Sequence, residues 1–219
     1  MILQSVITED GSSTLFVPEL NEHYHSIHGA IQESMHIFIG AGFKQLKTFP
    51  ACILEVGFGT GLNAFLTLLE SGKEEKQVQY SSIEKYPVDE SIVVKLNYPH
   101  QVDPSKTDIF KALHTAIWDD KVRITEHFTL HKIKSDLTDT QLPDSYYDLI
   151  YFDAFGPDVQ PALWTEEIFR MLNEAMKQGA WLVTYSVKGS VKRALKAAGF
   201  RIEKLPGPVG KREILRAFK

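Results

Sequence analysis

Three glycines at alternate positions, set between an apolar run and a leucine-rich segment, constrain this chain more than any other feature. The run ACILEVGF at residues 51–58 predicts a short buried strand. Residues 63–71 predict a helix that Gly72 stops. A strand, a glycine-rich turn and a helix favour a nucleotide-type site, because glycines allow a tight turn and let a ligand approach the backbone. The three glycines are Gly57, Gly59 and Gly61.

The rest of the chain repeats the alternation of strand and helix. β-branched and aromatic runs indicate strands, and apolar residues at helical spacing indicate helices. Repeated β-α units predict an α/β fold with a mostly parallel sheet and helices on both faces, closed by an antiparallel hairpin around a Pro/Gly turn. The predicted strands are residues 77–85, 128–137, 146–155 and 180–186, the helices are residues 87–97, 106–118, 165–179 and 190–199, and the hairpin is residues 200–218.

The N-terminal part is expected to be a small extension of this core. Two β-rich runs around Gly11 predict a hairpin within residues 1–20. Residues 21–43 are predicted to be helical, since their apolar positions are spaced for one buried face. We therefore expect one domain over residues 1–219, with residues 1–45 as a hairpin-plus-helix extension and residues 46–219 as the core.

Composition indicates a globular protein of a reducing compartment. Hydrophobic residues make up 43% and charged residues 24% of the 219, which excludes a disordered or collagen-like chain. Cys52 is the single cysteine, and we predict no metal site, although three histidines lie within residues 23–28. The chain starts without a signal-peptide pattern and has no membrane-length apolar run, so a cytoplasmic location is expected.

Charge is distributed unevenly along the chain. The net charge is −4, yet residues 188–219 hold ten Lys/Arg and two acids and so carry +8. Residues 1–187 therefore carry −12. The asymmetry favours a polyanionic partner at the C-terminal end, while a solvated helix face with lysine-protected strand edges remains the alternative.

The glycine loop differs from a dinucleotide fingerprint. In the Gly-x-Gly-x-x-Gly pattern Leu62 would stand at the last glycine. The observed Gly-x-Gly-x-Gly follows Glu55 and resembles motif I of S-adenosylmethionine-dependent methyltransferases. Glu84 and Asp136 end later strands, where a carboxylate can accept ribose hydroxyls or lie near an adenine amino group. A helix cap is the alternative for each single acid.

The predicted strand at residues 146–155 ends in Asp153, and Phe155 follows. Asp153 can hold an amine through a charge-assisted hydrogen bond, and Phe155 can stack on a planar substrate. A turn-forming Asp beside a core Phe is the alternative. A carboxyl group with an ordinary pKa of ~3.9 is a weak base at neutral pH, so orientation of the amine is the expected role and a base role stays open.

The motifs VGFGTGLN, SSIEKYP, FDAFGPDVQPALW and GKREIL, with HYHS and GAIQES near the start, resemble the methyltransferase domain of MnmC-type tRNA modification enzymes. The resemblance covers about residues 3–217. It implies a class I, Rossmann-like methyltransferase fold and N-methylation of 5-aminomethyl-2-thiouridine at the tRNA wobble position, giving the 5-methylaminomethyl form. This chain departs from the family by an insert at about residues 99–119 and by Gly156-Pro157 where the family usually has Ala-Pro.

The resemblance also implies partners and site residues. S-adenosylmethionine is the expected cofactor, and the anticodon region of tRNA is the expected partner. We expect no FAD, since the chain stops where fused members continue into an oxidase. We also expect no membrane partner, and a monomer is compatible with these expectations. Asp153 is expected to be catalytic. The expected cofactor contacts are Glu55, Gly57, Phe58, Gly59, Gly61, Asn63, Glu84 and Asp136, and the expected substrate contacts are Tyr24, Phe155, Lys188, Lys211 and Arg212.

Three other functions fit parts of the pattern. An aminopropyltransferase of the spermidine-synthase type shares the loop form D-x-x-x-P-x-x-x-P-A that starts at Asp153. A methyltransferase of small amines fits the same loop but leaves the basic C-terminal end unexplained. A non-catalytic binding module is expected to have lost the glycines or the Asp153 loop, and both are present.

Overall fold

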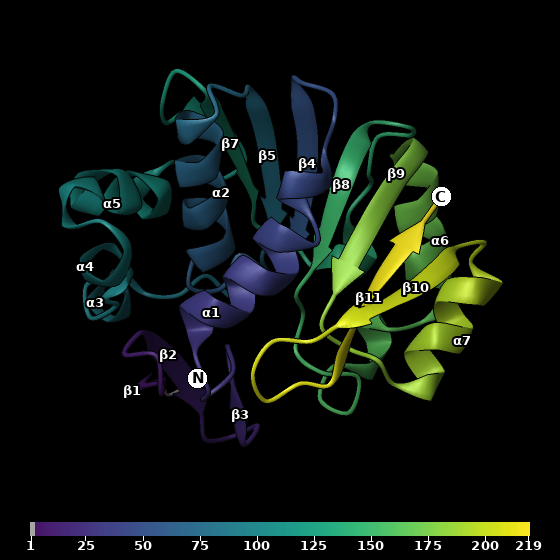
Figure 1. Cartoon of the computed structure of the whole chain (residues 1–219), viewed down its shortest axis with the longest axis horizontal. Helices are drawn as coiled ribbons and strands as arrows, with labels where there is room; N and C mark the ends of the chain where they lie inside the picture. Colours follow the sequence, from purple (N-terminus) through teal and green to yellow (C-terminus); the bar gives the residue numbers. More distant parts are fainter. Residues whose placement is uncertain (1–2) are drawn as a thin grey trace.

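A central sheet of eight strands organises the computed structural model, which describes residues 3–219 (Figure 1). Its strand order is β10-β11-β9-β8-β4-β5-β7-β6. The five strands from β9 to β7 are parallel, β11 lies antiparallel between β10 and β9, and β6 is antiparallel to β7. The predicted parallel sheet and closing hairpin are confirmed. The strands are β4 (Ala51–Val56), β5 (Val78–Ile83), β6 (Lys121–Arg123), β7 (Phe128–Ile133), β8 (Tyr147–Phe152), β9 (Met176–Thr184), β10 (Arg201–Pro206) and β11 (Glu213–Phe218).

Helices cover both faces of the sheet, and each face has its own core. Ile53 of β4 packs toward one core and Leu54 toward the other, because successive side chains of a strand point to opposite faces. The helices α1, α2 and α5 contribute to the first core, and α6 and α7 to the second. The helices are α1 (Ala30–Ser34), α2 (Leu62–Lys73), α3 (Glu90–Val93), α4 (Tyr98–Val102), α5 (Thr107–Thr115), α6 (Glu166–Ala175) and α7 (Gly189–Ala197), and a π-helix at Met35–Gly40 continues α1.

The N-terminal segment forms a separate three-stranded sheet of β1 (Gln4–Ile7), β2 (Ser13–Val17) and β3 (Glu22–His23). In Figure 1 it lies at the end of the central sheet to which the parallel strands point, close to the loop between β10 and β11. The predicted hairpin is confirmed. The predicted helix over residues 21–43 is wrong in its first part, because Glu22 and His23 pair with β2 and helix begins only at Ala30.

Two glycines were misassigned as helix ends. Gly72 lies inside α2, which ends at Lys73, and the left-handed residue just after that helix is Glu75. Gly179 lies inside β9 with φ +77°, where the pairing of β9 with β8 shifts register. The left-handed conformation of glycine occurs in β-bulges as well as at helix ends. The predicted helix over residues 165–179 therefore extends too far: it ends at Ala175, and the residues after it belong to β9.

The insert noted in the sequence becomes part of the core. Its helix α5 places Phe110 against Phe65 of α2, with ring centroids 5.2 Å apart, and buries Leu113 completely. The helix predicted at residues 87–97 is shorter than expected, with only α3 inside it, and the short α4 and β6 were not predicted.

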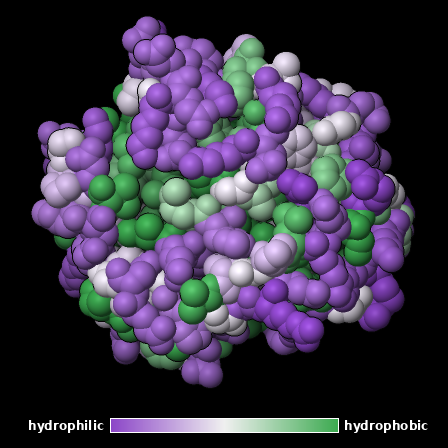
Figure 2. All heavy atoms as spheres, in the orientation of Figure 1, coloured by the Kyte–Doolittle hydropathy of each residue, from purple (hydrophilic) through white to green (hydrophobic). Residues whose placement is uncertain are grey.

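The viewed face in Figure 2 is mostly hydrophilic, with hydrophobic atoms confined to a few patches. No helix within residues 3–219 is long and apolar enough to cross a membrane.

Candidate active site

The glycine loop joins β4 to α2 in a conformation that requires glycine. Gly57 has φ +93°, and a Cβ there would lie 2.9 Å from the backbone oxygen of Asp153. Gly59 has φ +49°, and its Cβ would lie 3.1 Å from the Tyr24 ring. L-residues rarely adopt these backbone angles. The contact at Gly57 is closer than a Cβ tolerates, and the contact at Gly59 would require the Tyr24 ring to shift slightly. Gly57 and Gly59 also border open space.

That open space is a cavity of about 940 Å³ at the carboxyl ends of the parallel strands. Its walls are the loops after β4, β5, β7 and β8, together with residues 22–28 of the N-terminal extension and Gly210 and Lys211 of the C-terminal loop. Ligands of open α/β sheets bind at this edge. Ten of the predicted site residues line it: Tyr24, Gly57, Phe58, Gly59, Asn63, Glu84, Asp136, Asp153, Phe155 and Lys211.

Glu84 connects the glycine loop to the end of β5. Its Oε2 accepts a 3.0 Å hydrogen bond from the Gly59 amide, and its Oε1 accepts a 2.7 Å bond from the Tyr86 amide. Both bonds fix the carboxylate at the cavity wall. Each oxygen keeps acceptor capacity for a ligand hydroxyl, because a carboxylate oxygen can accept more than one hydrogen bond.

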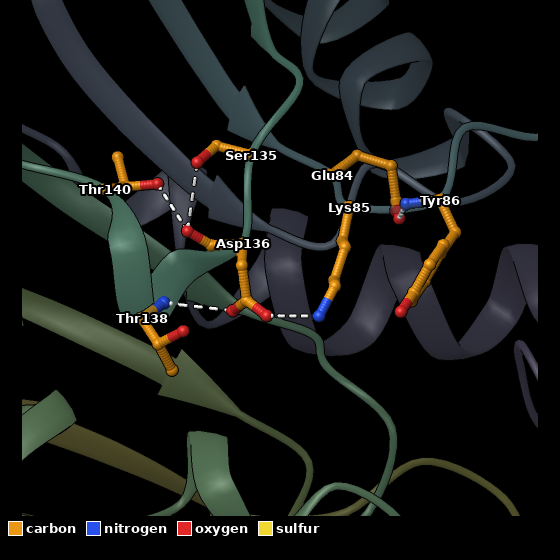
Figure 3. A network of polar contacts seen from close by, with 7 residues as sticks. All are labelled: Glu84, Lys85, Tyr86, Ser135, Asp136, Thr138 and Thr140. Atoms are coloured by element: carbon orange, nitrogen blue, oxygen red, sulfur yellow. Dashed lines mark hydrogen bonds and ion pairs between the residues drawn. The ribbon is translucent and has the colours of Figure 1, made fainter.

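Asp136 lies across the rim from Glu84, at the end of β7 (Figure 3). Lys85 donates a 2.6 Å bond to its Oδ2, and the Thr138 amide donates a 3.0 Å bond to its Oδ1. The Lys85 ammonium is the main cause of the lowered pKa of Asp136. Asp136 thus caps the short helical turn that follows it and also lines the cavity.

Asp153 follows β8 and occupies the inner end of the cavity. Its Oδ2 accepts a 2.8 Å hydrogen bond from Nδ2 of Asn63, in the first turn of α2. Burial raises the pKa of Asp153 to about 7, and the Glu33 carboxylate adds to this, whereas Asn63 and Lys211 act in the opposite direction. At neutral pH this carboxyl group can therefore exchange a proton, unlike an ordinary Asp.

Glu33 of α1 is a site residue that the sequence reasoning missed. It is 8% exposed, lines the cavity, and pairs with Lys211 at 2.9 Å. The Lys211 ammonium also lies 5.1 Å over the Tyr185 ring. Glu33 lies within the GAIQES motif, and the buried face expected for that helix could have indicated an acid in an unusual place. Pairing it with Lys211 required the tertiary structure.

Two aromatic side chains face one another in the cavity. Tyr24 and Phe155 meet edge to face, with centroids 5.1 Å apart and planes at 77°. The Phe155 loop is held by Gln160 Oε1, which accepts from the Phe155 amide at 3.0 Å, and by Trp164, which donates to the Phe155 carbonyl at 2.8 Å. The Tyr24 ring also contacts the glycine loop, so it can contribute to both the cofactor and the substrate parts of the cavity.

Four predicted site residues do not line the cavity. Glu55 is completely buried behind the loop, and Gly61 is the left-handed N-cap of α2. Lys188 forms an ion pair with Asp158 on the surface. Arg212 is exposed in the loop between β10 and β11, next to the cavity-lining Lys211. Phe58 lines the cavity, but its ring packs on His114 and Trp118 of the insert, with centroids 5.4 and 6.0 Å away.

Histidines of the extension do not form a metal site. His25 lies in the cavity wall, and burial lowers its pKa to about 4. Among residues 3–219 no three His, Cys, Asp or Glu side chains gather as metal ligands would.

The cavity fits S-adenosylmethionine by its shape and its charges. The glycine loop forms a cradle in the cavity wall, and the carboxylates of Glu84 and Asp136 can accept hydrogen bonds from hydroxyl and amino groups. Such a volume is at the upper end of ~300–1,000 Å³ for ligand pockets, so it leaves room for a second reactant beside Asp153.

Comparisons with known proteins agree with this geometry. Residues 107–219 match a family of S-adenosyl-L-methionine-dependent methyltransferases. The chain is 30% identical, over 96% of its length, to the tRNA 5-methylaminomethyl-2-thiouridine biosynthesis bifunctional protein MnmC of Cupriavidus metallidurans, but it spans only 33% of that protein. The crystal structure of MnmC2 from Aquifex aeolicus superposes with a TM-score of 0.81 at 25% identity, over 99% of this chain and 70% of that one.

A more distant match shows how widely the fold is used. Spermidine synthase from Thermotoga maritima superposes with a TM-score of 0.53 at 11% identity, over 100% of this chain and 72% of that one, which shows a common fold alone. The matched family, the glycine cradle and the strand-end carboxylates together show that this chain belongs to the S-adenosyl-L-methionine-dependent methyltransferases.

Proposed function

We propose that this chain methylates the aminomethyl nitrogen of 5-aminomethyl-2-thiouridine at the wobble position of tRNA, giving 5-methylaminomethyl-2-thiouridine. The observation that carries the proposal is the half-buried Asp153 carboxyl beside the glycine loop, in a cavity large enough for two reactants. The similarity to MnmC and MnmC2 supports the choice of substrate. We also propose that residues 1–219 act as one domain, since the extension supplies part of the cavity wall.

The cofactor half of the cavity is assigned to the strand ends. S-adenosylmethionine supplies an electrophilic methyl group on its sulfonium. Gly57 and Gly59 border the methionine part, Glu84 accepts the ribose hydroxyls, and Asp136 lies near the adenine. Glu84 also holds the Gly59 amide, so the loop and the ribose contact are positioned by one carboxylate.

The amine half of the cavity is assigned to Asp153. Methyl transfer needs a neutral amine, because an ammonium nitrogen has no free electron pair. With its pKa raised to about 7, Asp153 can accept the proton of the bound ammonium at neutral pH and keep the N–H bonds oriented. Holding the nitrogen in line with the methyl group then supplies most of the rate gain, since positioning can lower a barrier by several kcal/mol.

The uracil ring is assigned to the aromatic pair. Phe155 comes two residues after Asp153, and its loop is held by two hydrogen bonds, so it can stack on a planar base whose substituent points to Asp153. The Tyr24 ring lies beside Gly59 of the glycine loop and meets Phe155 edge to face. A base reaches such a cavity only when it is turned out of its stack, as in other enzymes that modify bases.

The phosphate backbone is assigned to a C-terminal basic surface, defined as Lys192, Arg193, Lys196, Lys204 and Arg212. These side chains come from α7, β10 and the loop beside the cavity. Lys204 forms an ion pair with Glu213 at 2.9 Å, and Arg212 and Lys192 also lower the pKa of Glu213, which supports placing these three cations on one surface. The remaining protein is acidic, so a polyanion is best accommodated here.

The proposal is tested by methyl transfer in vitro. Bulk tRNA carrying 5-aminomethyl-2-thiouridine, a free polyamine and a small primary amine are each offered with methyl-labelled S-adenosylmethionine. We expect label in the tRNA alone. Label in a free amine, or calorimetric binding of the cofactor with no transfer to any acceptor, would contradict the proposal and favour a small-molecule enzyme or a binding module.

A further inference from the structure

Glu55 is a carboxyl group inside the sheet that the cavity does not reach. It is 0% exposed on β4, and Ser82 of the neighbouring β5 donates a 2.6 Å hydrogen bond to its Oε2. Within residues 3–219 no group forms a hydrogen bond with its Oε1. A buried carboxylate oxygen without a partner is costly, so its protonation state needs an explanation.

Asn63 interacts with Glu55 on one side and with Asp153 on the other. Its Nδ2 donates to Asp153 at 2.8 Å, while its Oδ1 is buried and has no hydrogen-bond partner in the described part of the chain. Asn63 and the buried hydroxyl of Tyr80 both adjoin the Glu55 carboxyl. The unpartnered oxygens of Glu55 and Asn63 are both acceptors when Glu55 is ionised. The Tyr80 hydroxyl also has no hydrogen-bond partner in the described residues and can donate to Glu55, but Oδ1 of Asn63 is then still left without a donor hydrogen.

We propose that Glu55 carries that hydrogen and acts as a positioning residue for Asp153: its carboxyl O–H donates to Oδ1 of Asn63 and fixes the amide with Nδ2 toward Asp153. This inference rests on the proposed function, in which Asp153 receives the substrate amine. It gives the buried acid before the glycine loop a role away from the cofactor, in agreement with its place outside the cavity wall.

The surroundings of Glu55 favour its neutral form. The groups that face it are Ser82, Tyr80, Asn63 and Asp153, and none of these four carries a positive charge. Burial raises the pKa of Glu55 to about 8, and the negative charge of Asp153 adds to this, against the hydrogen bonds around it. Asp153 is different, since the Lys211 ammonium faces it as well as Glu33 and Asn63.

Ionisation of Glu55 would reverse the orientation of the Asn63 amide. A carboxylate beside Asn63 attracts its Nδ2, so the amide rotates and presents Oδ1 to Asp153. Two acceptors then face one another unless Asp153 holds a proton, and a protonated Asp153 cannot take one from the substrate. The proton on Glu55 thereby keeps Asp153 ionised and able to react.

The first test uses protein without substrate, so it stands even if the proposed function fails. Infrared spectra of the wild type, Glu55→Gln and the control Glu70→Gln are compared at pH 7. Glu70 is an acid near the C-terminal end of α2 that forms ion pairs with Lys44 and Lys73, so its carboxyl group is ionised at pH 7. Asp153, with its pKa of about 7, gives protonated-carboxyl absorption in all three proteins, so we expect this absorption to be weaker only in Glu55→Gln. Equal absorption in all three proteins would overturn the inference.

The second test measures the pH dependence of kcat for methylation. Gln offers a permanent N–H donor to Oδ1 of Asn63, so Glu55→Gln should keep kcat at pH 7 within about threefold. Wild-type activity should fall above about pH 8, as Glu55 loses its proton, and Glu55→Gln should lack this fall. Glu55→Leu has no donor and should lose kcat by about tenfold or more, with cofactor affinity retained.

Two outcomes overturn the inference. The first is a Glu55→Gln variant that binds the cofactor normally but is as inactive as Glu55→Leu, since Glu55 would then act through its negative charge. The second is an alkaline fall that persists in Glu55→Gln. Should Glu55→Leu not fold, Asn63→Leu serves in its place, with the same loss of kcat expected. A wild type that methylates no tRNA refutes the proposed function alone, because the infrared result is independent of it.

Discussion

The Lys211 ammonium lies 2.9 Å from Oε1 of Glu33 and joins the C-terminal loop to α1 across the cavity. Oε2 of the same carboxylate accepts a 2.7 Å bond from the Ser26 amide, so the pair is held from the extension as well. Asp153 experiences both charges, and they change its pKa in opposite directions. α1 and the C-terminal loop thus add opposing charges to the burial that raises the pKa of the proposed amine acceptor.

Replacing the charges of this pair should move the pH dependence of methylation in opposite directions. The ionised form of Asp153 is the active one, so kcat/KM should rise with pH through a midpoint near the Asp153 pKa of about 7. Glu33→Gln removes the negative charge that raises this pKa, so the midpoint should fall by about 0.5–1 pH unit. Lys211→Met removes the opposing positive charge, so the midpoint should rise by a similar amount.

Glu203→Gln is the matched control for this pair, because Glu203 binds Arg216 on the outer hairpin and does not line the cavity. Its midpoint should equal that of the wild type. Shifts of the same sign in Glu33→Gln and Lys211→Met would show that the two charges do not act on Asp153.

Asp153→Ala should separate cofactor binding from catalysis. We expect methylation to slow by about 10²-fold or more, the effect of losing a charge-assisted contact of ~2–3 kcal/mol in the transition state. Cofactor affinity, measured by calorimetry, should change only a few-fold. A variant that binds the cofactor poorly but keeps its rate at saturation would make Asp153 a cofactor ligand instead.

Gly59→Val should abolish binding of S-adenosylmethionine while the fold persists. The new Cβ would lie 3.1 Å from the Tyr24 ring, at a backbone φ of +49° that L-residues rarely adopt, and its methyl groups would enter the cofactor path. Gly72→Ala is the control, because nothing lies within 4 Å of a Cβ at Gly72. Calorimetry and circular dichroism check both variants. Near-normal affinity in folded Gly59→Val would refute the assigned cradle.

Affinity for tRNA should depend on the C-terminal basic surface and on salt. Phosphate contacts release counterions, so changing Lys192 and Arg212 together to Ala should weaken binding and flatten the salt slope by about one to two units. The matched control changes Lys111 and Lys121 to Ala, two exposed lysines in α5 and β6 that do not line the cavity. Equal slopes in both double variants would place the tRNA on another face.

The sequence predicts the parts of this site that depend on local pattern. The glycine loop and the strand-end residues Glu84, Asp136 and Asp153 line the cavity as expected, because the carboxyl ends of parallel strands meet at one edge. Glu55 was assigned to the cofactor from its place before the loop, yet β4 is a central strand covered on both faces, so every one of its side chains is buried.

Contacts between distant segments could not be predicted in this way. Glu33 and Lys211 meet only after the extension and the C-terminal loop fold over the strand ends. Gly179 shows a different limit: a glycine after a helical pattern indicates a helix end, and the same left-handed conformation here forms a bulge in β9. The local sequence thus indicates a position that needs glycine, while the tertiary structure determines whether that position is a helix end or a β-bulge.

The most direct test of the account is mass spectrometry of nucleosides from tRNA before and after incubation with this protein and S-adenosylmethionine. The tRNA carries 5-aminomethyl-2-thiouridine, and Asp153→Ala serves as the matched enzyme control. The account predicts that this nucleoside declines and that 5-methylaminomethyl-2-thiouridine appears in equal amount with the wild type, and far more slowly with the variant. An unchanged nucleoside profile, or a methyl group on a different nucleoside, would contradict it.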